Sequence, residues 1–317
     1  MSNDIKRVTG LLVIEAVNSN PNGNPDADSD PRQRDNGQGE ISPVSFKRKL
    51  RDLIEISDGP VFQTLLKPQE KDGKTIYSGL SSEIPDGYQF CILESRGRDR
   101  KAIFKEMGPK ESFIESNYEN SVFVKKYWDA RIFGNTFLES KDSGDSDSGK
   151  PRNKGYIKTG IVQFGMGISV CPVIIQRHTN TNKAGVQEGK NQGMAPLAYR
   201  VVEHGVYVMP FFINPSLAAK SGCKLCDVEL LWRLIPYAYD HTRSAIRPDV
   251  RIRHAWWIEH KDALGSCPDH LLIDALTPKR KGDDPLAPST SWDDYHVPSA
   301  LPDDLNGKVA ARDLMEL

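Results

Sequence analysis

No stretch of the sequence approaches the ~20 consecutive apolar residues that a membrane-spanning helix needs, and hydrophobic residues make up only 38% of the chain. The opening segment, MSNDIKRVTG, has neither the apolar core nor the small-residue cleavage site of a signal peptide. We therefore expect a cytoplasmic protein with no membrane contact. An excess of one charge is also missing, because 42 Lys and Arg face 43 Asp and Glu, for a net charge of -1. This balance excludes a chain that is basic throughout, but a nucleic-acid site needs only a local group of Lys and Arg.

Cysteine is scarce, and the motifs of the common cofactor sites are missing. Of the five cysteines only Cys223 and Cys226 form a CxxC, and no second pair completes a four-ligand zinc site. The chain has no GxxxxGK[ST] loop for nucleotide phosphates, no HExxH and no GxSxG. We therefore expect no cofactor, no bound metal and incidental, reduced cysteines.

What the chain does have is a series of apolar segments separated by long polar ones. Their periodicity predicts strands at 8–17, 88–94, 156–175 (broken by glycines), 204–214 and 251–260, and helices from 43, over 111–128 and from 227. With the middle region set aside, this order approximates a β-α-β-β-α-β motif, which is an α+β fold. The sheet of that motif is a common surface for single-stranded RNA. The length suits one large domain or two ordinary ones.

Four polar segments separate these elements, and their composition predicts no regular structure. They are 18–40, 141–155, 177–196 and the Pro- and Asp-rich tail after 270. Loops of more than ~15 residues inside a compact domain are usually functional or disordered. The loops at 18–40 and 177–196 are therefore candidates for a binding role.

The first predicted helix combines an apolar stripe with a group of cations. Ser42 is its expected N-cap and Pro43 its first residue. Lys47 and Arg51 lie along one border of the stripe, Lys49 lies along the other, and Arg48 points away. The apolar stripe consists of Phe46, Leu50, Leu53 and Ile54. Such a helix could present cations to phosphate groups, or it could have an ordinary solvated face.

The first long loop carries a partial metal-binding pattern. Asp26, Asp28 and Asp30 have the spacing of the first ligands of an EF-hand, but Pro31 and Gly37 stand where that loop needs Gly and Glu. Two or three carboxylates could still hold Mg²⁺ for phosphodiester hydrolysis. Asp beside Asn and Pro is also ordinary turn chemistry.

Several blocks of the sequence resemble one known family. They are NSNPNGNPDAD at 18–28 with FKRKLR at 46–51, DARIFG at 129–134, TGIVQF at 159–164, HGVY at 204–207 with FINP at 212–215, and DHTRSA at 240–245 with HKDALG at 260–265. Together they span roughly residues 8–270. In this order they resemble the CRISPR-associated Cascade backbone subunit of the type I-C subtype.

The resemblance implies an RRM- or ferredoxin-like palm with a finger-like insertion and a projecting thumb loop. On this chain the palm would comprise residues 1–59 and 156–270, with the thumb at 177–196. Residues 60–155 would form a helical, finger-like insertion, and 271–317 a C-terminal tail. Several copies would polymerise in a helical filament along a CRISPR RNA (crRNA) without catalysing a reaction. The guide would remain free to pair with a target DNA strand.

The resemblance also implies partners and RNA-binding residues. The further partners would be the large subunit, the subunit that caps the crRNA 5′ end, and a helicase-nuclease recruited to the complex. Arg177 and Lys190 of the thumb would contact phosphate, and Met194 would fill the space left by a displaced base. Met194 could equally make a small packing contact. The expected RNA-binding residues are Asn22, Asn24, Arg32, Arg34, Lys47, Arg48, Lys49, Arg51, Arg131, Gln163, Arg177, Lys190 and Met194.

Two alternatives remain open at this point. One is a metal-dependent RNA endonuclease of related fold, like the type III backbone subunits, that uses a loop aspartate such as Asp26 or Asp28. The other is a structural protein that only oligomerises.

Overall fold

The main element of the structure, a computed structural model, is a large antiparallel sheet. The structure describes residues 5–95, 97, 103, 121–137, 156–183 and 194–316. The sheet has eight strands in the order β14-β11-β1-β10-β8-β2, and β7 and β9 also pair with β10. The bounds are β1 Val8–Ser19, β2 Gln38–Ile41, β7 Val162–Phe164, β8 Gly167–Pro172, β9 Ile175–Lys183, β10 Met194–Ile213, β11 Val250–His260 and β14 Val309–Asp313.

The centre of the sheet has the strand order expected of a ferredoxin-like fold. Strand β1 lies between β10 and β11, and both pairs are antiparallel over almost the whole of β1. The next strands beyond β10 are β7 and β8. In chain order these elements read β1, helix α1, β7 and β8, β10, helix α7 and β11, which confirms the predicted α+β class and the β-α-β-β-α-β order.

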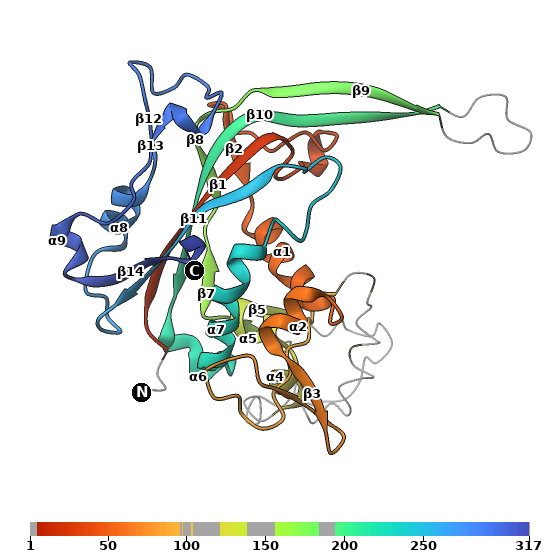
Figure 1. The fold of residues 1–317 in the computed structure, drawn as a ribbon, viewed down its shortest axis with the longest axis vertical. Helices are drawn as coiled ribbons and strands as arrows, with labels where there is room; N and C mark the ends of the chain where they lie inside the picture. Colours follow the sequence, from red (N-terminus) through yellow and green to blue (C-terminus); the bar gives the residue numbers. More distant parts are fainter. Residues whose placement is uncertain are drawn as a thin grey trace, which may run out of the picture.

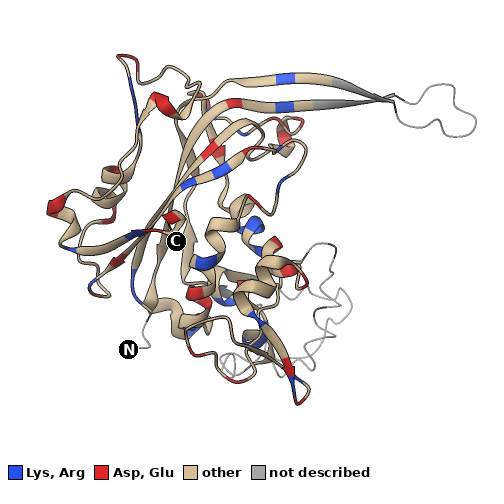
Figure 2. Ribbon diagram, in the orientation of Figure 1, with Lys and Arg blue, Asp and Glu red and all other residues tan. Residues whose placement is uncertain are grey.

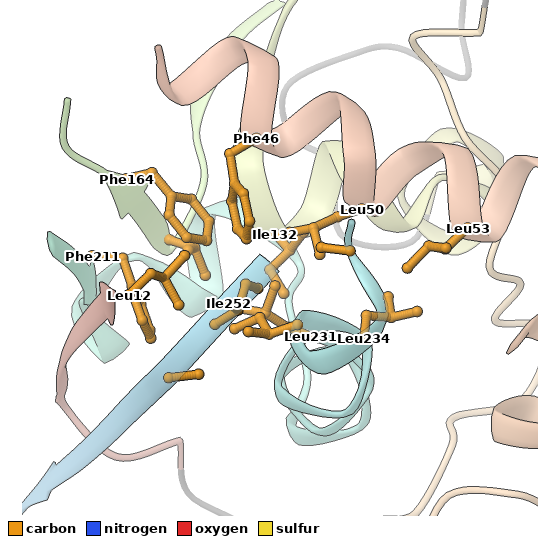
Figure 3. Close-up of a cluster of buried hydrophobic side chains, with 14 of the residues drawn as sticks. Leu12, Phe46, Leu50, Leu53, Ile132, Phe164, Phe211, Leu231, Leu234 and Ile252 are labelled. Atoms are coloured by element: carbon orange, nitrogen blue, oxygen red, sulfur yellow. The ribbon is translucent and has the colours of Figure 1, made fainter. Parts of the chain in front are cut away.

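Two helices cover one face of this sheet (Figure 1). Helix α1 spans Pro43–Glu55, and its N-cap Ser42 accepts a hydrogen bond from the Ser45 amide, as the sequence predicts. Helix α7 spans Leu225–Leu234 and continues as the 3-10 turn η5, Ile235–Tyr237, at Pro236. Figure 3 shows the shared core, in which side chains of both helices meet those of β1, β7, β10 and β11.

The C-terminal segment covers the other face, which corrects the prediction of an irregular tail. It contains α8 Asp269–Leu276, β12 Lys279–Arg280, η6 Trp292–Asp294, β13 Tyr295–His296, α9 Asp303–Asn306, β14 and η7 Leu314–Glu316. Leu272, Leu276 and Leu305 pack against Leu11 and Val13 of β1. The tail is therefore part of the folded domain, and it occupies the sheet face on which single-stranded RNA was expected.

The described ends of the segment predicted as the polar loop 177–196 are strands of a β-ribbon, and residues 184–193 lie outside the described residues. Strand β9 pairs with the first half of β10, from Ile175 opposite Val202 to Lys183 opposite Met194. The ribbon projects away from the palm (Figure 1). Strand β10 then enters the middle of the sheet without interruption, so one strand belongs to both the ribbon and the palm.

The inserted region contains hairpins as well as helices. Its elements are α2 Pro60–Leu66, β3 Pro68–Lys71, β4 Lys74–Tyr77, α4 Val122–Lys126, α5 Trp128–Phe133 and β5 Gly134–Phe137, which pairs with β6 Tyr156–Thr159. The strand predicted at 88–94 is wrong, because the one pairing there is an isolated bridge from Cys91 to Tyr127. The predicted helix at 111–128 lies partly outside the described residues, and its described part is divided between α4 and α5. The predicted loop at 141–155 also lies outside them.

The segment 156–175 is broken at glycines, as the sequence predicts, and forms β6, β7 and β8. Gly160 marks the first break, because a Cβ there would lie 2.3 Å from the Gly134 nitrogen. In the loop predicted at 18–40, the structure forms the 3-10 turn η1, Pro25–Ala27, and strand β2. Short turns, η4 Pro215–Leu217 and α6 Ala218–Ser221, connect β10 to α7. Among the helices of the described residues, none has the length and apolar character to span a membrane.

Candidate nucleic-acid interface

The end of the ribbon next to the sheet, which we call its root, lies at Arg177 and Arg200 and is joined to the first long loop by ion pairs. Arg177 of β9 binds the Asp30 carboxylate through Nε at 3.2 Å and Nη2 at 2.6 Å. Arg200 of β10 reaches the same carboxylate at 3.4 Å and also donates to the Asp28 carbonyl at 2.6 Å. Figure 2 shows basic positions on both strands of the ribbon, β9 and β10, and further ones on β11 and α1. Hydrogen bonding from Arg177 lowers the pKa of Asp30 below its ordinary value.

The predicted polar contacts of the first loop mostly shape the loop itself. Asn22 accepts a hydrogen bond from the Ser42 amide at 2.7 Å and so joins the loop to the start of α1. Asn24 caps η1 by accepting from the Asp26 amide at 3.2 Å. Arg34 is exposed and pairs with Glu40 at 2.5 Å. The Arg32 side chain is half-buried and makes no ion pair with any described residue.

Lys47 is the cation of α1 that the structure leaves without a carboxylate partner among the described residues. Its ammonium lies 5.3 Å from the centroid of the Phe133 ring, and the Arg51 guanidinium lies at the same distance from that ring. Burial and the nearby Arg51 charge lower the pKa of Lys47. The Glu94 charge acts on Lys47 in the opposite direction but forms no ion pair with it, so the ammonium can still accept an approaching phosphate as partner.

The other three cations of α1 bind partners within the protein, and for Arg48 this also corrects the predicted placement. Arg48 does not point to solvent: it binds Asp52 at 2.7 Å, the Glu94 carbonyl at 2.6 Å and Glu55. Lys49 is 7% exposed and donates to the Thr242 carbonyl at 3.5 Å. Arg51 is 5% exposed.

The DARIFG block at 129–134 supplies two buried ion pairs that attach the insertion to the palm. Asp129 accepts from Arg51 of α1 at 2.9 Å and from the Leu93 amide at 2.7 Å. Arg131, with 0% exposure, binds Asp227 of α7 at 2.7 Å. The prediction that Arg131 lines the RNA groove is therefore wrong, because its guanidinium lies inside the protein.

The remaining predicted contacts are scattered or outside the described residues. Val162 and Phe164 of β7 face the core beneath α1, so the alternation of a strand places Gln163 on the opposite face, away from Lys47. Gln163 is exposed and donates to the Gly160 carbonyl. Lys190 and the side chain of Met194 lie outside what the structure describes.

A segment that was not among the predicted contacts lies beside α1. It is the loop 238–249, which carries the basic residues Arg243 and Arg247. Arg247 donates to the Asn20 carbonyl at 2.9 Å, and Lys49 of α1 reaches the same loop at Thr242. The exposed Tyr237 ring contacts His241 edge-on at 5.9 Å between centroids. The DHTRSA block at 240–245 was the available signal for this surface.

The aspartates and cysteines predicted as possible metal ligands do not form a metal-binding site among the described residues. Asp30 is bound by Arg177 and Arg200, and Asp28 lies 3.5 Å from Arg200. Among the described residues, no group of three or more His, Cys, Asp or Glu side chains could hold a metal ion. Cys223 and Cys226 are buried free thiols, and burial raises the pKa of both, which disfavours the thiolate that binds zinc.

Comparison with known proteins decides the family. The family model for the CRISPR-associated protein Cas7 matches residues 6–300. The chain belongs to the Cas7 family. The CRISPR-associated protein Cas7 of Haloferax volcanii is 23% identical over 242 residues, which are 71% of this chain and 63% of that protein. The chain thus spans less than two thirds of the length of this curated relative. The family predicted from the sequence is thus confirmed, while the I-C subtype stays a prediction.

Two solved structures are also similar to the chain. One, from a CRISPR RNA-guided surveillance complex, has 13% identity and a TM-score of 0.34, with 80% of this chain and 70% of that chain covered. The other, from a CRISPR RNA-guided surveillance complex in a pre-nicking state, has 11% identity and a TM-score of 0.37, with 81% and 79% covered.

Proposed function

We propose that this Cas7-family protein is the crRNA-binding backbone subunit of a type I CRISPR Cascade effector, of the I-C subtype. The observation that carries the proposal is the Cas7 match over residues 6–300, which includes the palm, the insertion and the ribbon. Copies of the chain bind side by side along one guide and present it to a target DNA strand without catalysing a reaction. The large subunit, the 5′-end-capping subunit and the recruited helicase-nuclease complete the set of partners.

The RNA-binding surface in this proposal follows the α1 rim and the ribbon. Lys47 and Arg32 contact phosphate directly, and Arg34 joins them by exchanging Glu40 for phosphate. The loop around Asn22 and Asn24 borders the same path, and Lys190 and Met194 remain predicted RNA contacts. Guide recognition of this kind works through backbone charge and shape, while base pairing reads sequence. Arg48, Lys49, Arg51 and Arg131 support the surface from within.

Purification without nuclease treatment tests the proposal. The protein should retain RNA, with a high ratio of absorbance at 260 nm to 280 nm and a discrete RNA length after extraction. Protein that is free of nucleic acid and does not bind added crRNA would refute the proposal. RNA cutting that needs a divalent metal and disappears in Asp26→Asn/Asp28→Asn would instead establish the endonuclease alternative.

The role of Lys47 can be measured by salt dependence. Lys47→Ala should weaken RNA binding and reduce the slope of log K against log salt by about 0.7, the value for one phosphate contact on a single strand. Lys74→Ala is the matched control, because Lys74 is an exposed lysine on the β3–β4 hairpin. Equal slopes for Lys47→Ala and the parent would show that Lys47 contacts no phosphate and that α1 presents an ordinary solvated face.

A further inference from the structure

Both strands of the ribbon are held at their root by a single carboxylate. Asp30 is only 15% exposed at its side chain, and it lies between Arg177 of β9 and Arg200 of β10. These two arginines are directly opposite each other in the β9–β10 register. The carboxylate therefore contacts the ribbon at one level on both strands.

The loop that carries Asp30 is a compact turn over residues 24–30, which we call the bracket. The Asn24 amide donates to the Asp30 carbonyl at 2.7 Å, and the Asp30 amide donates to the Ala27 carbonyl at 2.8 Å. Asp28 and Ser29 have φ values of 50° and 65°, the left-handed conformation of a tight turn. Arg200 also donates to the Asp28 carbonyl at 2.6 Å, so the same turn binds this arginine through a second group.

Because the bracket binds the ribbon at its root, a small change of angle there moves the far end of the ribbon by several ångströms. From Arg200 to Met194 the ribbon extends about 20 Å at ~3.3 Å per residue, so a rotation of about 10° at the root moves its far end by about 3.5 Å. That displacement exceeds the tolerance of a hydrogen bond. The angle of the ribbon at Arg177 and Arg200 therefore decides whether its outer part can meet RNA held by a neighbouring copy.

We propose that Asp30 is a positioning residue that binds Arg177 and Arg200 and fixes the angle of the ribbon for assembly on RNA. This role rests on the proposed function, and it reassigns Arg177 from a phosphate contact to a structural one. Asp30 acts before RNA arrives, because the bracket and the two arginines are already in contact. Asp30 thus sets the geometry of assembly rather than holding a metal ion.

The test compares Asp30→Ala with Asp26→Ala, a matched control because Asp26 is an exposed carboxylate of the same turn that makes no ion pair with a described residue. Hydrogen exchange of the RNA-free protein should be several times faster at amides around Arg177 and Arg200 in Asp30→Ala only. On a long RNA, Asp30→Ala should need about tenfold more protein for assembly, the effect of losing one charge-assisted contact. Binding to an RNA of about six nucleotides should not change.

Four outcomes separate the possibilities. Unchanged exchange and assembly in Asp30→Ala would overturn the positioning role. Tighter binding to both RNA lengths would also overturn it, because Asp30 would then merely compete with phosphate for the arginines. In the paired variant Asp30→Arg/Arg177→Asp, assembly should recover relative to Arg177→Asp alone, and failure to recover would make Arg177 a direct phosphate contact. If the parent binds no RNA, the proposed function fails, while the exchange measurement still tests the bracket.

Discussion

Removing the carboxylate of Asp227 should destabilise the protein more than any surface change. The Arg131 guanidinium has no exposure and directs all of its donors inward, to Asp227 and to the carbonyls of Val124, Lys125 and Gln89. Asp227→Ala leaves this buried cation with carbonyl partners only. Because these groups come from the insertion and from α7, the loss should loosen the insertion from the palm.

The magnitude follows from the burial of both partners. Breaking a fully buried ion pair by removing one partner costs about 3–5 kcal/mol, because the remaining charge is desolvated without compensation. Domains of this kind are typically stable by about 5–15 kcal/mol. Asp227→Ala should therefore remove a large fraction of the free energy of unfolding. In Arg131→Met/Asp227→Ala the loss should be smaller, since no charge is left unpaired.

Urea unfolding followed by tryptophan fluorescence measures this loss, and Trp128 reports on the contact because its indole donates to the Asp227 carbonyl at 3.2 Å. Asp86→Ala is the control, since it removes an exposed pair with Lys74 in the insertion and should leave the midpoint within error of the parent. A loss below about 1 kcal/mol in Asp227→Ala would refute the reasoning, because it would mean that Arg131 has found solvent or another acid.

Three further predictions concern the sheet. Burial alone would raise the pKa of Asp313, but hydrogen bonds from His254 and from backbone amides lower it. The contribution of Asp313 to stability should therefore be complete above the ordinary Asp pKa of ~3.9 and lost as pH falls through the lowered value. Asp313→Asn should remove this pH dependence from unfolding curves. Tyr207→Phe should keep or raise the melting temperature, since the buried hydroxyl has no hydrogen-bond partner among the described residues; a clear fall would show that a partner exists. Gly10→Ala should destabilise by at least about 1–3 kcal/mol in urea unfolding, because its Cβ would lie 2.0 Å from the Phe211 ring; parent-like stability would contradict this.

The elements predicted correctly are those whose signals are local. The aliphatic run at 8–17 and the Ser42-Pro43 helix start each depend on neighbouring residues, and both occur in the structure. The ribbon was missed because RHTNTNK in β9 has no apolar alternation. Its described part is held by backbone pairing with β10 rather than by a buried face.

The candidate site was harder to predict because its charges have distant partners. Arg131 meets Asp227 from 96 positions away, and Arg177 meets Asp30 from 147 positions away. Composition cannot distinguish an arginine that will be buried against such a partner from one that will face RNA. Lys47 differs from its neighbours on α1 only because Asp52, Asp129 and the Thr242 carbonyl engage the other three.

The C-terminal cover of the sheet has a consequence for how the protein unfolds. Successive side chains of β1 enter different cores, with Leu12 and Ile14 beneath the helices and Leu11 and Val13 beneath the tail. Neither core can melt while β1 stays in place without exposing the apolar side of the strand that it covers. Palm and tail should therefore unfold in one calorimetric transition, and a destabilising change on either face should lower the same melting temperature.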